Sequence, residues 1–307
     1  MTAAGTSQAP APKPAPSRDE LRAHLVRTMI AGDVATPRQN NLLHYRRMAA
    51  GHPYYQFGLE LKPSWTEQTV LEMMVERCGV DPDPRHIYGD DTIDPEITLD
   101  TLEAMGRRIG LAARRQETVV IATGHPATLT PLYQGVAQAL ADAGCRLLTP
   151  AAGWTYEIEV GYGGLDLRRI VYAEPGVAML EGDDRRTHHT HDPHPMEAML
   201  RELTGGERAG GELARDERAN TASEGAAEAK PDIWPDLAIA DHGWAGAAGQ
   251  AGIDTVGFAD CNDPALFAGA AEGKIDVAVP LDDGIAPHHY APLTAYILDH
   301  AGLYPPR

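Results

Sequence analysis

Short apolar runs recur along the chain from residue 118 onward, and each is followed by polar residues. The runs are residues 118–123, 237–240, 256–259 and 275–279. Runs of this length and composition are typical of strands that are buried on both faces of a parallel sheet. Helical patterns at 127–143 and 290–300 and a small, Gly-rich stretch at 243–252 separate or follow these runs. The pattern predicts an α/β fold, with a Rossmann-like, mostly parallel sheet in three layers.

The region between the first and second apolar runs has a different pattern. Residues 146–148 read as a further strand, and residues 154–160 and 170–181 are rich in strand formers. Pro175-Gly176 suits a hairpin turn within the latter stretch. A helix is predicted at 195–203.

Residues 18–116 look largely helical. Helices are predicted at 18–29, 40–50, 64–79 and 95–116. In the third, Ser64 and Glu67 have the spacing of a capping box, and Gly79 suits the C-terminal end. The fourth has an apolar stripe of Ile97, Leu99, Leu102, Met105 and Ile109.

These patterns divide the chain into three parts. Residues 1–17, rich in Pro and Ala, are predicted to form a disordered tail, 18–116 a helical subdomain, and 117–307 the α/β core. Residues 204–230 are polar, Gly-rich and without periodicity, which predicts a flexible insertion in that core.

Composition narrows the class of protein. The 307 residues carry a formal net charge of −18. This charge argues against nucleic acid as a partner, because the affinity of proteins for nucleic acids comes mainly from cationic side chains that contact phosphate. No apolar run approaches the roughly 20 residues that cross a bilayer, and the N-terminus has no apolar signal region. Three scattered cysteines form no CxxC pair. A cytoplasmic protein with no membrane partner is expected, and a homo-oligomer is left open.

Acidic and imidazole side chains follow the apolar runs. Because parallel strands end at one edge of their sheet, these side chains are expected to share one rim. Asp241-His242 is the strongest pair, since both residues continue a strand poorly and suit metal ligation or acid/base catalysis. The rim is predicted to contain His125, Asp241, His242, Asp260, Asn262, Asp263, Asp282, Asp283 and His288.

A divalent ion, Mg²⁺, Mn²⁺ or Zn²⁺, is the cofactor that these residues suit. The loop 187–195 adds four histidines, and imidazoles suit transition metals. The candidate metal ligands are Asp241, His242, Asp260, Asp282, His189 and His191. Structural alternatives remain open: a solvated loop for the histidines, a helix cap for Asp241, and a helix start at 260–264.

Phosphate-binding groups are predicted in two places. Gly124 to Thr128 lie between a strand and a helix, where free backbone N–H groups suit an anion, and His125 at the strand exit is a candidate catalytic residue. Arg38 and Arg46 could pair with phosphate. The alternatives are an ordinary strand-to-helix turn and a solvated helix face.

Several catalytic motifs are absent. The chain has no GxSxG serine elbow, no Walker A or GxGxxG loop and no DxDx[TV] aspartyl-phosphate motif. Phosphate chemistry in this chain would therefore use activated water in place of that aspartyl nucleophile.

Four segments together resemble a group of actinobacterial cytoplasmic proteins labelled simply "phosphatase". They are THHTHDPHPMEAML, ADHGWAGAAGQAGIDTVGFADCNDPALF, VVIATGHPATLTPLYQGV and VPLDDGIAPHHY. The resemblance covers about residues 19–303, and it implies hydrolysis of phosphomonoesters without supplying a set of catalytic residues.

The leading hypothesis is metal-assisted hydrolysis of a small phosphomonoester. In it, Asp241, His242 and one or more of His125, Asp260 and Asp282 hold the metal or act as acid or base. The alternatives are a non-hydrolytic binding protein or isomerase for a sugar phosphate or nucleotide, and a metal-dependent enzyme that acts on no phosphate.

Overall fold

A computed structural model describes residues 14–160, 164–205 and 233–304. The predicted flexible insertion at 204–230 and the predicted tail therefore lie almost wholly outside the described residues. Ser17, where the tail was predicted to end, caps the first helix through a capping box with Glu20.

The helices follow the sequence pattern closely. They are α1 (Arg18–Arg27), α2 (Arg38–Ala49), α3 (Glu67–Cys78), α4 (Pro95–Arg115), α5 (Pro126–Asp142), α6 (His194–Leu203), α7 (His242–Gln250), α8 (Pro264–Ala271) and α9 (Ala291–Ala301), with the short 3-10 helices η1 (Pro53–Tyr55) and η3 (Pro287–Tyr290). The capping box of α3 is formed by Thr66 and Thr69, which corrects the prediction of Ser64 and Glu67. Gly79 ends that helix with a φ of 79°, as its position predicted.

The strands form two sheets. They are β1 (Gly32–Pro37), β2 (Asp90–Ile93), β3 (Thr118–Ala122), β4 (Arg146–Leu147), β5 (Thr155–Val160), β6 (Gly164–Ala173), β7 (Val177–Glu181), β8 (Thr187–His188), β9 (Leu237–Ala240), β10 (Asp254–Ala259) and β11 (Val277–Pro280). β1 and β2 pair antiparallel in a small sheet that the sequence reading missed, because both strands are short and polar.

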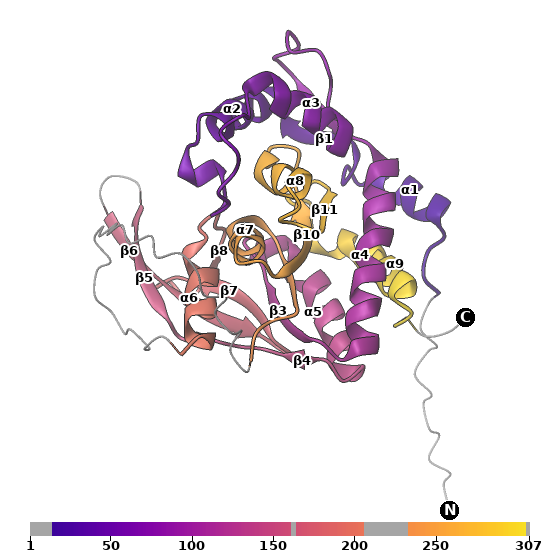
Figure 1. Cartoon of the computed structure of the whole chain (residues 1–307). Helices are drawn as coiled ribbons and strands as arrows, with labels where there is room; N and C mark the ends of the chain where they lie inside the picture. The colour runs from indigo at the N-terminus through magenta and orange to yellow at the C-terminus, as the bar shows by residue number, and fades with distance from the viewer. Residues whose placement is uncertain (1–13, 161–163, 206–232, 305–307) are drawn as a thin grey trace, which may run out of the picture.

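The main sheet is mixed but mostly parallel, in the order β11-β10-β9-β3-β7-β6-β5. β11, β10, β9, β3 and β7 run parallel, whereas β6 and β5 extend the sheet antiparallel at one edge, on the left of Figure 1. The hairpin between β6 and β7 turns at 174–176, where it was predicted.

Helices cover both faces of this sheet, which confirms the three-layer α/β prediction. α4, α5 and α9 contact one another along one face, while α6, α7 and α8 line the other, with α2 and α3 outside α8 (Figure 1). α7, with glycines or alanines at six of its nine positions, is buried over nearly its whole length against β9 and β10. One continuous hydrophobic core runs from Leu21 to Ala301, and α4, from the predicted helical subdomain, contacts β11.

Candidate metal centre at the strand ends

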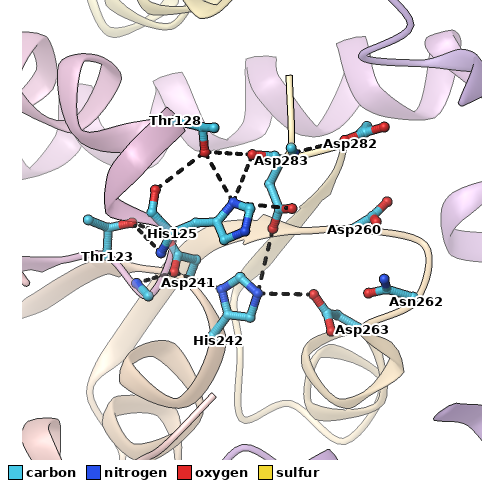
Figure 2. Close-up of polar contacts among 12 residues, drawn as sticks. Thr123, His125, Thr128, Asp241, His242, Asp260, Asn262, Asp263, Asp282 and Asp283 are labelled. Carbon is cyan, nitrogen blue, oxygen red and sulfur yellow. Dashed lines mark hydrogen bonds and ion pairs between the residues drawn. The ribbon is translucent and has the colours of Figure 1, made fainter. Parts of the chain in front are cut away.

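The polar residues after the parallel strands converge at one rim of the main sheet, as Figure 2 shows. β3 leads to His125, β9 to Asp241 and His242, β10 to Asp260 and Asp263, and β11 to Asp282 and Asp283. The loop after β8 adds His189 and His191 from the side.

His242 lies at the centre of this rim. It is the first residue of α7 and has a φ of 50°, an uncommon conformation for a residue with a Cβ. Its Nδ1 lies 2.9 Å from Asp241 Oδ1, and its Nε2 lies 3.2 Å from Asp263 Oδ2 and 3.6 Å from Asp283 Oδ2. The strained backbone thus aims the ring between three carboxylates.

Three groups of side chains each bring their ligand atoms within 4.8 Å of one another. They are His189/His191/His242, His242/Asp263/Asp283 and Asp260/Asp282/Asp283. Because His242 and Asp283 each belong to two groups, the three groups form one connected centre that could bind metal.

Two carboxylate oxygens of this centre are buried without a hydrogen-bond partner among the described residues. They are Asp263 Oδ1 and Asp283 Oδ2, and His191 Nδ1 is likewise unpartnered. Buried polar atoms normally have partners, and an ion is one explanation for those that do not. These residues therefore fit a divalent cation.

The electrostatics of the centre are those of crowded, desolvated ligands. Burial, together with Asp263, Asp241 and Asp282, raises the pKa of Asp283 to about 8. Burial and the facing carboxylates also raise the pKa of Asp260. Desolvation and the nearby His242 lower the pKa of His189 to about 4 and that of His191 to about 3, so both imidazoles are neutral and available as ligands at neutral pH.

His242 and Asp263 behave as an ion pair. Burial opposes charge on His242, but Asp263 and Asp241 raise its pKa well above the usual value. Burial likewise opposes the charge of Asp263, yet His242 lowers its pKa. A cation bound beside Asp263 and Asp283 would take over the charge that the imidazolium now supplies.

Asp241, predicted as a metal ligand, does not belong to any of the three groups of possible ligands. Its Oδ2 accepts from Thr123 Oγ1 at 2.8 Å, and its Oδ1 accepts from Gly124 N and faces His242 Nδ1. Neither does it cap α7, since its side chain makes no capping hydrogen bond. Asp241 instead orients His242, as carboxylates behind metal-binding histidines commonly do.

His125 is held at the edge of the centre. Its Nδ1 lies 2.8 Å from the carbonyl oxygen of Asp283 and 3.1 Å from Thr128 Oγ1, and its ring centroid lies 4.6 Å from that of His189. Burial and the nearby His242 lower the pKa of His125. A neutral ring that donates from Nδ1 leaves Nε2 as a proton acceptor.

The turn from Gly124 to Thr128, predicted to bind an anion, has several of its donors engaged within the protein. Gly124 N donates to Asp241, His125 N donates to Thr123 Oγ1, and Thr128 Oγ1 donates to the carbonyl of Asp283 at 2.6 Å. The bonds from Gly124 and Thr128 join the segment after β3 to the ends of β9 and β11, and so they hold the centre together.

The two predicted phosphate-binding arginines lie elsewhere. Arg38 is fully buried, pairs with Asp91 at 2.7 Å and donates to the carbonyls of Asp83 and His86. Arg46 is 64% exposed and pairs with Glu67 on α3. Both make structural contacts outside the centre.

Gly124 is needed for close contact between three segments. A Cβ at this position would lie 2.5 Å from the carbonyl oxygen of Thr190 and 3.0 Å from Asp241 Oδ1. Gly243 has the same role against the backbone of His191 and Asp192. The histidine loop, residues 189–193 between β8 and α6, can therefore lie directly on the turn after β3 and on α7.

We expect Gly124→Ala to reduce the free energy of unfolding by about 1–3 kcal/mol, because the carbonyl of Thr190 must move. Urea denaturation measures the loss. Ala127→Ser, at an exposed position of the same turn, is the control and should change stability by less than about 0.5 kcal/mol. An equal loss in both variants would contradict the packing argument.

Most residues of this centre were predicted to lie on one rim, but their predicted roles differ from the grouping in the structure. Asp263 and Asp283 were on the predicted rim without being assigned to the metal, and Thr123 was missed. Asp263 precedes Pro264 and so resembles a helix cap, but its side chain makes no capping bond. The position of Asp283 after a buried strand was the available signal.

Comparison with known proteins agrees with the resemblance found in the sequence motifs. A family model described as Phosphatase matches residues 16–305. Phosphatase SCO2771 of Streptomyces coelicolor is 48% identical over 290 residues, which are 94% of this chain and 97% of that protein. The resemblance found in the sequence motifs is confirmed. Among the described residues, no helix is long and apolar enough to span a membrane.

Proposed function

This chain belongs to the Phosphatase family, and from that premise we propose that it hydrolyses small phosphomonoesters with the help of a divalent cation. The observation that carries the proposal is the connected centre of His189, His191, His242, Asp260, Asp263, Asp282 and Asp283, with its unpartnered buried oxygens. Asp241, His125, Gly124 and Thr128 support that centre as positioning residues or, for His125, as a base.

The ligand types indicate which cation fits. Imidazoles suit transition metals, whereas the all-carboxylate group Asp260/Asp282/Asp283 suits Mg²⁺ or Mn²⁺. Mn²⁺ and Zn²⁺ each accept both imidazole and carboxylate ligands. Bound there, a divalent cation offsets the negative charge of a phosphoryl group and activates water.

The protein's own groups would supply the remaining steps. His125, neutral and held through Nδ1 by the Asp283 carbonyl, would take a proton from the attacking water at Nε2. His242, oriented by Asp241, would stay fixed between the histidine loop and the carboxylates. The buried carboxylates would bind the cation and leave the phosphate group facing the histidine loop.

We expect hydrolysis of phenyl phosphate to stop when the protein is treated with a strong chelator and to return when Mn²⁺, Mg²⁺ or Zn²⁺ is added. Melting temperature should rise on adding the effective ion, because the ion binds the folded state and relieves repulsion among the carboxylates. Elemental analysis of the purified protein gives an independent measurement.

Hydrolysis that survives chelation, with no stoichiometric metal, would overturn the mechanism. Tight binding of a phosphorylated ligand without turnover, in the presence of metal, would favour the binding-protein alternative instead.

A further inference from the structure

A cavity of about 690 Å³ opens beside the histidine edge of the metal centre. His189 and His191 line it, so the cavity and the centre share two residues. Its volume suits a small organic ligand. The cavity is therefore the space through which a substrate could reach the centre.

The floor of the cavity is the antiparallel edge of the main sheet. Residues directly opposite each other on paired strands point to the same face, and Tyr156 on β5 pairs with Arg168 on β6. η1, through Pro53 and Tyr54, and the histidine loop also line the cavity. Ile158 and Leu180 make much of the remaining floor apolar.

Arg168 is the only arginine or lysine among the described lining residues, and it is only 7% exposed. Its Nη2 pairs with Asp166 at 2.7 Å. Its Nε and Nη1 are buried without a hydrogen-bond partner among the described residues. A buried guanidinium with two unused donors is costly unless a ligand uses them.

Acidic residues in the same cavity leave these donors free. Asp192 bonds to the imidazole of His194, while Glu159 is exposed. Glu197 lies at the start of α6 and has no ion pair with Arg168. The cation of Arg168 is thus matched by one carboxylate, Asp166, and retains donors for a second anion.

The separation between β6 and β3, the strand that leads to His125, indicates which anion Arg168 could bind. β6 is the second strand from β3 in the order β3-β7-β6, which corresponds to about 10 Å between the strands. A single phosphate group at the metal centre is too small to span that distance. A second anionic group on the same molecule could reach Arg168.

We infer that this cavity binds the substrate and that Arg168 recognises a second anionic group, a carboxylate or another phosphate, on the phosphomonoester. The inference rests on the proposed function for the position of the first phosphate. It assigns the substrate class as small phosphomonoesters with an additional negative charge beyond a short, partly apolar spacer.

Binding can be tested without hydrolysis. Phenylphosphonate and 4-carboxyphenylphosphonate differ by one carboxylate, and neither can be cleaved as a phosphate ester. With the Mn²⁺-loaded protein, we expect calorimetry to show that the carboxylate tightens binding by about 10-fold or more, as a charge-assisted hydrogen bond would. Equal affinities, or no binding of either compound, would overturn the inference.

Variants identify the residue. Arg168→Met keeps much of the side-chain volume and removes the donors, so the 10-fold preference should fall to near 1. Arg169→Met is the matched control: Arg169 is the next residue on β6, points to the other face and lies near Glu181 and Asp183, so the preference should persist. The same loss in both variants would contradict a specific role for Arg168.

A wild-type measurement covers the case in which Arg168→Met fails to fold. 4-(Aminomethyl)phenylphosphonate carries a cation in place of the carboxylate and should bind more weakly than phenylphosphonate. Stronger binding of the aminomethyl compound would show that the acidic residues determine which charge the cavity prefers. That result would contradict the inference.

Failure of the two proposals can be told apart. An Arg168-dependent preference among the phosphonates, with no hydrolysis of phenyl phosphate or 4-carboxyphenyl phosphate, would remove the hydrolytic function and leave the anion site. If both esters are hydrolysed with equal kcat/KM and Arg168→Met does not change that ratio, the hydrolytic function stands. The second-anion site is then removed. If Arg168→Met weakens both phosphonates equally, the arginine binds the first phosphate and the second-anion assignment is wrong.

Discussion

Asp283→Asn is expected to reduce phosphomonoester hydrolysis by about 100-fold or more while making the metal-free protein more stable. Asp283 belongs to two of the three ligand groups, so neutralising it weakens both at once. The same carboxylate is buried near Asp260, Asp263 and Asp282, and burial raises its pKa to about 8. Because folding raises this pKa, at neutral pH the folded protein must either keep a desolvated charge or take up a proton, and asparagine removes that cost.

The two effects have opposite signs, and this separates a functional role from a structural one. Activity with added Mn²⁺ and the melting temperature of chelated protein are the two measurements. Asp276→Asn is the control, because Asp276 precedes the same strand at its opposite end and accepts a bond from Thr255 N that asparagine can also accept. Wild-type turnover in Asp283→Asn would remove the centre from the mechanism, and a large loss of stability would show that the carboxylate supports the fold.

The parallel part of the sheet could be predicted because its strands are short, apolar and each followed by a polar break. β3, β9 and β10 begin and end within about two residues of the predicted runs. A strand that is buried on both faces is a continuous apolar run, so it can be recognised in the sequence without knowing its partner strand. The predicted α/β class follows from that signal alone.

The antiparallel edge was harder to interpret. In β6, Arg168 and Arg169 are adjacent, yet one is buried in the cavity and the other points to the opposite face. The sequence shows the alternation of a strand, but it does not show which face of the strand is covered. That depends on η1 and the histidine loop. Arg168 was missed for that reason.

The candidate metal centre could be outlined from the sequence because strand order determines which loops meet. Direct ligands and supporting residues cannot be separated from the sequence, since both are Asp and His at strand ends. Asp241 and Asp263 illustrate this: each follows a buried strand, but Thr123 and Gly124 occupy the oxygens of Asp241, whereas one oxygen of Asp263 has no partner. That difference arises from the packing of β3 beside β9.

Arg38 shows how burial changes the meaning of a residue. An arginine near an amide pair and a histidine suggests anion binding, but here Asp91 from β2 is the anion, and Asn41 shares it at 2.7 Å. The partner lies 53 residues away, on a strand too short and polar to be recognised. Long-range pairing of this kind leaves no local pattern in the sequence.

Substitutions at Asp241 should separate positioning from folding. Asp241→Asn can still accept from Gly124 N, but it loses the charge that orients and polarises His242. Supporting carboxylates of this kind contribute about 10–100-fold to metal affinity or activity, so Mn²⁺ affinity and turnover should fall by that amount. Excess Mn²⁺ should recover part of the turnover, because a weakened site still fills at high concentration of the ion.

Asp241→Ala should behave differently, because alanine leaves three donors in the core without an acceptor: Thr123 Oγ1, Gly124 N and His242 Nδ1. Each buried unpaired group costs about 1–3 kcal/mol, so the free energy of unfolding should fall by several kcal/mol, and added Mn²⁺ should not restore wild-type turnover.

Urea denaturation of both variants, beside Mn²⁺ titrations of activity, tests the pair. If Asp241→Ala were as stable as wild type, the network joining β3 to β9 would have to be redrawn. If Asp241→Asn kept full Mn²⁺ affinity, the carboxylate would not act through His242, and that imidazole would be held in place by Asp263 and the strained backbone alone.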